Sequence, residues 1–113
     1  MKEKRKHKRF KLQNQPLVCD ANSSMFLGNM VDVSVGGFKL RTNEKLTQGK
    51  DYLFKIITQS DTGGESQIIA KINVRWCNEN SDSNDYYVGC SLGENDFKTR
   101  LELSSLVIQA LNG

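Results

Sequence analysis

Two arginines near the start of the chain, Arg5 and Arg9, are well suited to bind an anion. A guanidinium group can contact a phosphate through two hydrogen bonds at once, and its flat face can stack on a base. Seven of residues 1–11 are basic and only Glu3 is acidic. The spacing of four within this cationic segment therefore predicts phosphate binding.

A second polar group lies at the end of an expected strand, where Asp32 and Ser34 alternate with valines. Alternate positions point to the same side of a strand, so the carboxylate and hydroxyl are predicted to face solvent together. Gly36 and Gly37 follow, and paired glycines permit a tight reversal with positive φ and the close approach of a ligand. The carboxylate suits N–H donors such as a guanine edge, and the hydroxyl and nearby amides suit phosphate oxygens.

The sequence predicts neither catalysis nor a metal site. His7 is the only histidine, and no nucleophile with a base, metal constellation or phosphate-cradling loop is visible. Cys19, Cys77 and Cys90 are odd in number and lack metal-ligand spacing, which indicates reduced thiols. We expect a non-enzymatic domain without a cofactor.

Length and charge indicate one small domain with a basic arm. The 113 residues suffice for one modest core. The net charge of +3 conceals an asymmetry, because residues 12–113 hold 9 basic and 12 acidic side chains. We expect a flexible arm at 1–11 and a folded body at 12–113. No apolar run approaches the roughly 18 residues that span a bilayer, so we expect a cytoplasmic protein without membrane insertion.

The body is predicted to be mainly β. Short β-branched and aromatic runs separated by turn residues are typical of an antiparallel sheet or barrel. Six strands are expected near residues 17–21, 25–33, 37–42, 51–58, 66–78 and 86–92. At 95–111 apolar residues recur at helical spacing, which predicts a terminal helix covering an open end or face of the barrel.

The fifth expected strand has the clearest alternation. Its apolar side chains share one face: Ile68, Ala70, Ile72, Val74 and Trp76. This pattern predicts a half-buried strand with Trp76 in the core, and a wall beside a stacked base is the alternative for that indole. By the same parity Cys77 faces outward and Cys90 inward, which argues against a disulfide between them.

Both motifs together resemble those of the PilZ domain family. Residues 5–9, Arg-Lys-His-Lys-Arg, match the RxxxR motif, and residues 32–37, Asp-Val-Ser-Val-Gly-Gly, match the D/NxSxxG motif in the same order and separation. PilZ domains are bacterial receptors for cyclic di-GMP, built as a six-stranded antiparallel β-barrel with a C-terminal α-helix. The resemblance covers nearly the whole chain. It implies a cyclic di-GMP site formed by Arg5, Arg9, Asp32, Ser34, Gly36 and Gly37.

Further residues could contribute to such a site. Lys4, Arg75 and Trp76 are carried as secondary contacts. Three more cations are expected to face outward, either extending the positive field or simply solvated: Lys39, Arg41 and Lys71.

Signalling without catalysis requires a partner. We expect the arm to close over the ligand and change the surface that a downstream protein contacts, in a monomer or a dimer. The alternative is a small β-barrel that binds nucleic acid through its arm and outward aromatics. With Trp76 assigned inward and Phe26 the only aromatic on the outer face of the second strand, the sequence disfavours nucleic acid.

Overall fold

The computed structural model describes residues 10–11, 15–34, 36–59, 64–93 and 97–112, which form strands and one helix. These elements are β1 (Phe10–Lys11), β2 (Leu17–Asp20), β3 (Phe26–Ser34), β4 (Gly37–Thr42), β5 (Asp51–Gln59), β6 (Glu65–Asn80), β7 (Asp85–Leu92) and α1 (Phe97–Asn112). The strands β2 to β7 and the helix lie where the sequence predicts them. The short strand β1 was not expected.

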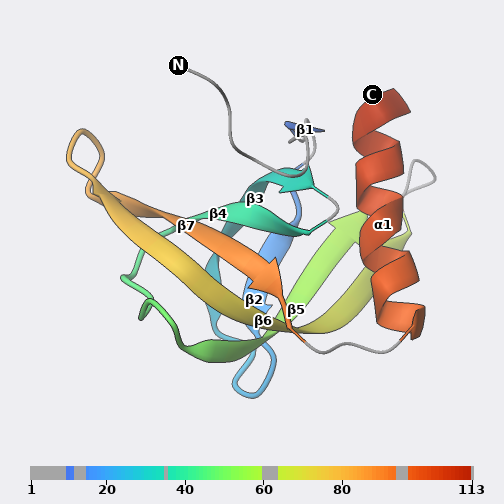
Figure 1. Cartoon of the computed structure of the whole chain (residues 1–113), viewed down its shortest axis with the longest axis horizontal. Helices are drawn as coiled ribbons and strands as arrows, with labels where there is room; N and C mark the ends of the chain where they lie inside the picture. Colours follow the sequence, from blue (N-terminus) through green and yellow to red (C-terminus); the bar gives the residue numbers. More distant parts are fainter. Residues whose placement is uncertain (1–9, 12–14, 35, 60–63, 94–96, 113) are drawn as a thin grey trace.

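Strands β2 to β7 form a closed antiparallel barrel (Figure 1). The order around the ring is β3-β2-β5-β6-β7-β4, and β4 pairs again with β3 to close it. Each of these pairings is antiparallel. The predicted fold class, a six-stranded antiparallel barrel with a C-terminal helix, is confirmed.

The hydrophobic core fills the barrel. On β6 the alternating side chains of Ile68, Ala70, Ile72 and Val74 are all buried. Each large aliphatic side chain buried in this way contributes roughly 1.5–3 kcal/mol to stability. The alternation that predicts a half-buried strand therefore holds over the first part of β6.

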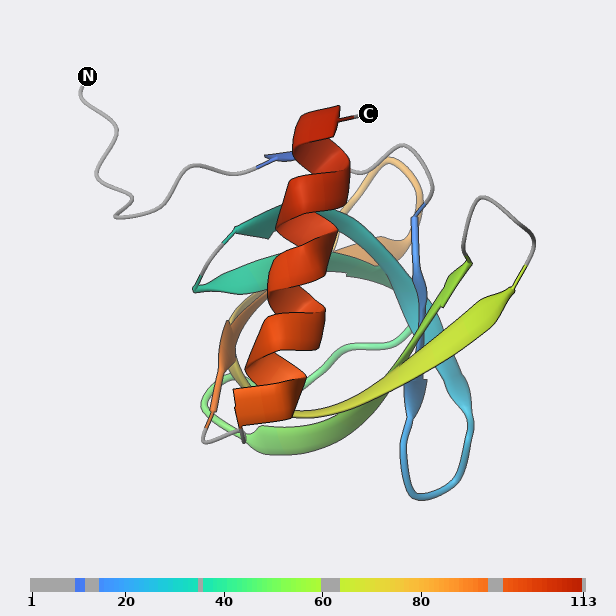
Figure 2. The ribbon, with the colours of Figure 1, turned by 90° about the vertical axis from the view of Figure 1, so that its right-hand side faces the viewer.

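Helix α1 lies across one open end of the barrel (Figure 2). It contacts β1, β3 and β6. Leu103 is 4% exposed and belongs to the core, whereas Leu101 on the same helix is 54% exposed. The apolar face of the helix thus closes an end of the barrel, as the sequence predicts.

A β-bulge in β6 changes the alternation near its middle. Val74 pairs with Cys90, yet the next pair in the ladder is Trp76 with Gly89, so Arg75 is an extra residue. An extra residue in one strand shifts the following side chains to the opposite faces. Trp76 therefore leaves the inner face, and the prediction that it lies in the core is wrong.

The same bulge turns Cys77 inward. Cys77 pairs with Val88 and packs against the core, so the prediction that it faces outward is also wrong. All three cysteines are free thiols, which confirms the expectation of no disulfide between Cys77 and Cys90. The reason is their register, because each pairs with a valine of the other strand.

Strand β3 is long enough to pair with two strands along one edge. Its first part pairs with β2 as far as Asn29. Beyond that point β1 takes over, with Phe10 opposite Val33 and Lys11 opposite Asp32. The chain that follows the basic arm is therefore attached to β3 beside Asp32.

Candidate functional site

Asp32 and Ser34 lie on the outer wall of the barrel at the end of β3. Val33 between them is buried in the core, so the alternation turns both polar side chains outward, as predicted. Asp32 is nevertheless only 6% exposed, and Lys39 on β4 forms an ion pair with it. The prediction that this carboxylate is open to solvent is therefore wrong.

The turn from β3 to β4 contains Gly36 and Gly37. The Ser34 hydroxyl donates a hydrogen bond to the carbonyl oxygen of Gly37 at 3.3 Å. A Cβ at Gly37 would lie 2.0 Å from the carbonyl oxygen of Cys90, so the close approach of β7 requires glycine there. Gly37 does not have the positive φ expected of this reversal. Gly36 is exposed at the tip of the turn.

Lys39 lies between a carboxylate and an aromatic ring. Its Nζ is 3.3 Å from Oδ2 of Asp32 and 5.4 Å from the ring centroid of Tyr87. Ring faces attract cations at such distances. The Lys39 side chain is 32% exposed, so its charge is partly removed from water. The expected outward orientation is confirmed, with specific partners in place of simple solvation.

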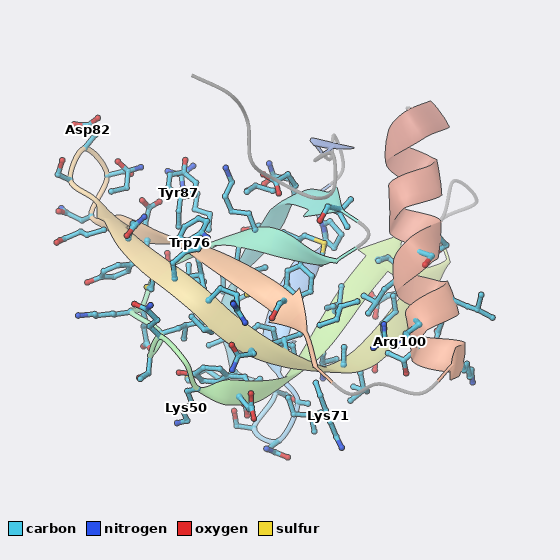
Figure 3. All side chains as sticks on the ribbon, in the orientation of Figure 1. Lys50, Lys71, Trp76, Asp82, Tyr87 and Arg100 are labelled. Atoms are coloured by element: carbon cyan, nitrogen blue, oxygen red, sulfur yellow. The ribbon has the colours of Figure 1, made fainter. Side chains whose placement is uncertain are left out.

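Trp76 rests on the same outer wall. A Cβ at Gly89 would lie 2.2 Å from both Cε2 and Nε1 of the indole, so Trp76 packs against the bare backbone of β7. Gly89 also pairs with Lys39, which places the indole and the lysine in one row around the barrel. Figure 3 shows Trp76 and Tyr87 on the same side of the β6–β7 hairpin.

A second ion pair ties β4 to the β6–β7 hairpin. The Nε of Arg41 donates to Oδ2 of Asp85, and the Ser83 hydroxyl donates to Oδ1 at 2.7 Å. The Ser83 hydroxyl, followed by the Arg41 guanidinium, holds the pKa of the Asp85 carboxyl below its ordinary value. Arg41 is thus engaged within the fold, whereas Arg75 at the bulge and Lys71 are exposed.

Three predicted contacts lie outside the described residues: Lys4, Arg5 and Arg9. Arg9 is bonded to Phe10, however, and Phe10 pairs with Val33. The following residue, Lys11, pairs with Asp32. The backbone that leads out of the arm therefore runs beside the carboxylate of the second motif.

Sequence reasoning misses Tyr87 and Gly89 as parts of this wall. Both alternate with Val88 in β7, so their outward orientation could have been read from parity. The position of Trp76 over Gly89 could not, because it depends on the bulge in β6.

The described part of the chain shows no cluster of three or more His, Cys, Asp or Glu residues placed to hold a metal ion. Within that part, no helix combines the length and the apolar character needed to cross a bilayer.

Several solved structures share this fold. The inhibitor of motility MotI/DgrA of Bacillus subtilis matches with a TM-score of 0.74 and 16% identity over 98% of this chain and 53% of its own. The PilZ domain of YcgR from Escherichia coli, solved with c-di-GMP, matches at 0.70 and 10% identity over 97% and 93%. The MrkH–c-di-GMP complex of Klebsiella pneumoniae matches at 0.75 and 15% identity over 99% and 54%.

This chain spans about half the length of the Bacillus and Klebsiella proteins. At these identities the likeness establishes the fold. No curated protein sequence matches the chain. The sequence model of the PilZ domain, in contrast, matches residues 3–109, so the chain belongs to the PilZ domain family.

Proposed function

We propose that this PilZ domain is a receptor for cyclic di-GMP and signals to a protein partner. Membership of the family supports the ligand, as do the YcgR domain and MrkH structures, which contain c-di-GMP. The observation that carries the proposal is the pairing of β1 with β3, which joins the end of the basic arm to the strand holding Asp32. Two motifs far apart in the sequence thus meet on one wall.

The proposed ligand lies on the outer wall between the arm and the β3–β4 turn. Arg5 and Arg9 bind its phosphates and stack on its guanines. Asp32 accepts hydrogen bonds from guanine N–H groups. Ser34 and the backbone amides at 36–37 serve its oxygen acceptors.

Three secondary contacts complete the proposed site. Trp76 offers the apolar face of its indole beside a stacked base, since it rests on the outer wall and not in the core. Lys4 and Arg75 add positive charge around the phosphates. None of these roles is catalytic, and the domain acts as a receptor in the cytoplasm.

Signalling follows from closure of the arm. Residues 1–11 would order over the bound nucleotide while the barrel stays unchanged, which alters the surface offered to a downstream partner. Amide exchange of the arm, measured with and without cyclic di-GMP, tests this closure. Equal protection in both states would contradict the closure without contradicting binding.

Calorimetry tests the binding itself. Arg9→Ala should weaken cyclic di-GMP binding at least about tenfold, because a charge-assisted hydrogen bond is worth roughly 1.5–3 kcal/mol. Arg100→Ala removes the same charge from an exposed position on α1 and should bind like the wild type. A wild-type protein that does not bind cyclic di-GMP would refute the proposal.

A single-stranded oligonucleotide tests the alternative function in the same titration. The scarcity of outward aromatics that disfavoured nucleic acid does not hold, since Trp76 and Tyr87 both lie on the outer wall. Binding of the oligonucleotide in preference to cyclic di-GMP would favour a nucleic-acid-binding barrel.

A further inference from the structure

Lys39 occupies part of the carboxylate that the proposed function assigns to guanine. Its Nζ lies 3.3 Å from Oδ2 of Asp32. The guanine edge presents two adjacent N–H donors, so a carboxylate binds it fully only with both oxygens. The ammonium group and a guanine therefore compete for the same Oδ2 atom.

We propose that Lys39 exchanges partners when the nucleotide binds. Its ammonium pairs with Asp32 in the empty protein and with a phosphate oxygen in the complex. This inference rests on the proposed function, because it requires a guanine nucleotide with phosphates at this wall. It makes Lys39 a ligand-binding residue in addition to the two arginines of the arm.

The exchange lies within reach of the lysine side chain. Lys39 and Gly37 occupy the same face of β4, two positions and hence about 6.6 Å apart along the strand. A flexible four-carbon stem lets the ammonium cover such a distance. The backbone stays in place, because Lys39 pairs with Asp32 on one side and with Gly89 on the other.

The electrostatics of the wall favour a phosphate as the new partner. Leaving Asp32 would strand a partly desolvated cation beside Tyr87, whose ring is 5.4 Å away. A buried or half-buried charge that loses its partner is unfavourable. The nucleotide supplies a new anion as its base removes the old one, so the lysine stays paired throughout.

Lys39→Met tests the exchange by calorimetry with cyclic di-GMP. We expect about tenfold weaker binding, since a charge-assisted contact to phosphate is lost. Lys50→Met is the matched control, because Lys50 also lies over a tyrosine ring, 5.1 Å from the centroid of Tyr52. It removes the same charge far from the site and should leave the affinity unchanged. Lys39→Arg keeps the charge and should bind within a few-fold of the wild type.

Phosphorus NMR of the bound nucleotide separates direct contact from an indirect effect through Asp32. The ³¹P shift should differ between the wild type and Lys39→Met and agree between the wild type and Lys50→Met. Unchanged affinity of Lys39→Met, or weaker binding with an unchanged ³¹P shift, would overturn the exchange while leaving the receptor function intact. Failure of the wild type to bind would remove both.

Discussion

At the scale of single residues, Gly89 decides where the only tryptophan lies. Its neighbours Val88 and Cys90 are buried in the core, so position 89 faces the outer wall. The missing side chain leaves room for Trp76, which rests directly on the backbone. A residue without chemistry of its own thus shapes the aromatic part of the candidate site.

Gly89→Ala should displace Trp76 from the wall. The new Cβ would lie 2.2 Å from two ring atoms, and overpacking of this kind costs roughly 1–3 kcal/mol. We expect a lower free energy of unfolding in urea and a red-shifted emission from the single tryptophan. Gly93→Ala is the control, since its Cβ would have 3.4 Å to the nearest atom. Wild-type emission from Gly89→Ala would show that the contact does not hold the indole.

At the scale of elements, local patterns predict strands well and irregularities in them poorly. Alternation along Ile68 to Val74 identifies β6 and its inner face, because a regular strand has a period of two. The bulge after Val74 breaks that period, and no turn residue marks it. Trp76 and Cys77 were consequently assigned to the wrong faces. Such a shift is set by pairing with β7, which local sequence does not contain.

Asp85 should make the β6–β7 hairpin sensitive to acid. Its pKa lies below the unfolded value of about 3.9, because Ser83 and Arg41 stabilise the charged form. The charged carboxylate therefore adds stability above that value, and this contribution disappears as the pH falls through the lower folded pKa. The stability advantage of the wild type over Asp85→Asn should be present at pH 7 and shrink below about pH 4.

Urea unfolding of both proteins across this pH range measures the effect. Asp82→Asn, an exposed carboxylate in the same turn, controls for the loss of one charge. A pH-independent difference between the wild type and Asp85→Asn would contradict the assignment.

At the scale of the whole molecule, fold class and organisation were predictable because the barrel follows from strand number, strand length and a terminal amphipathic helix. The meeting of the two motifs on one wall was not predictable from pattern alone. It depends on β1, only two residues long, pairing beyond the end of β2. Similarly, the pairing of Lys39 with Asp32 depends on the register between β3 and β4.

Leu103→Ala should destabilise the whole domain. The side chain is 4% exposed in the core under α1, and truncating a buried leucine costs about 2–5 kcal/mol. The midpoint of urea unfolding should fall accordingly. Leu101→Ala on the same helix is the control, because Leu101 is 54% exposed and its loss should change the midpoint little. Equal effects of both substitutions would mean that the helix does not seal the barrel.

The attachment of β1 to β3 has a consequence for how strongly each arginine can contribute. Arg9 directly precedes the anchored residue Phe10, so its encounter with a docked phosphate is intramolecular, with an effective concentration set by a very short tether. Arg5 is four residues further from the anchor, and the longer tether dilutes it. The two members of one motif should therefore differ in strength, with Arg5→Ala losing less affinity than Arg9→Ala in a parallel titration.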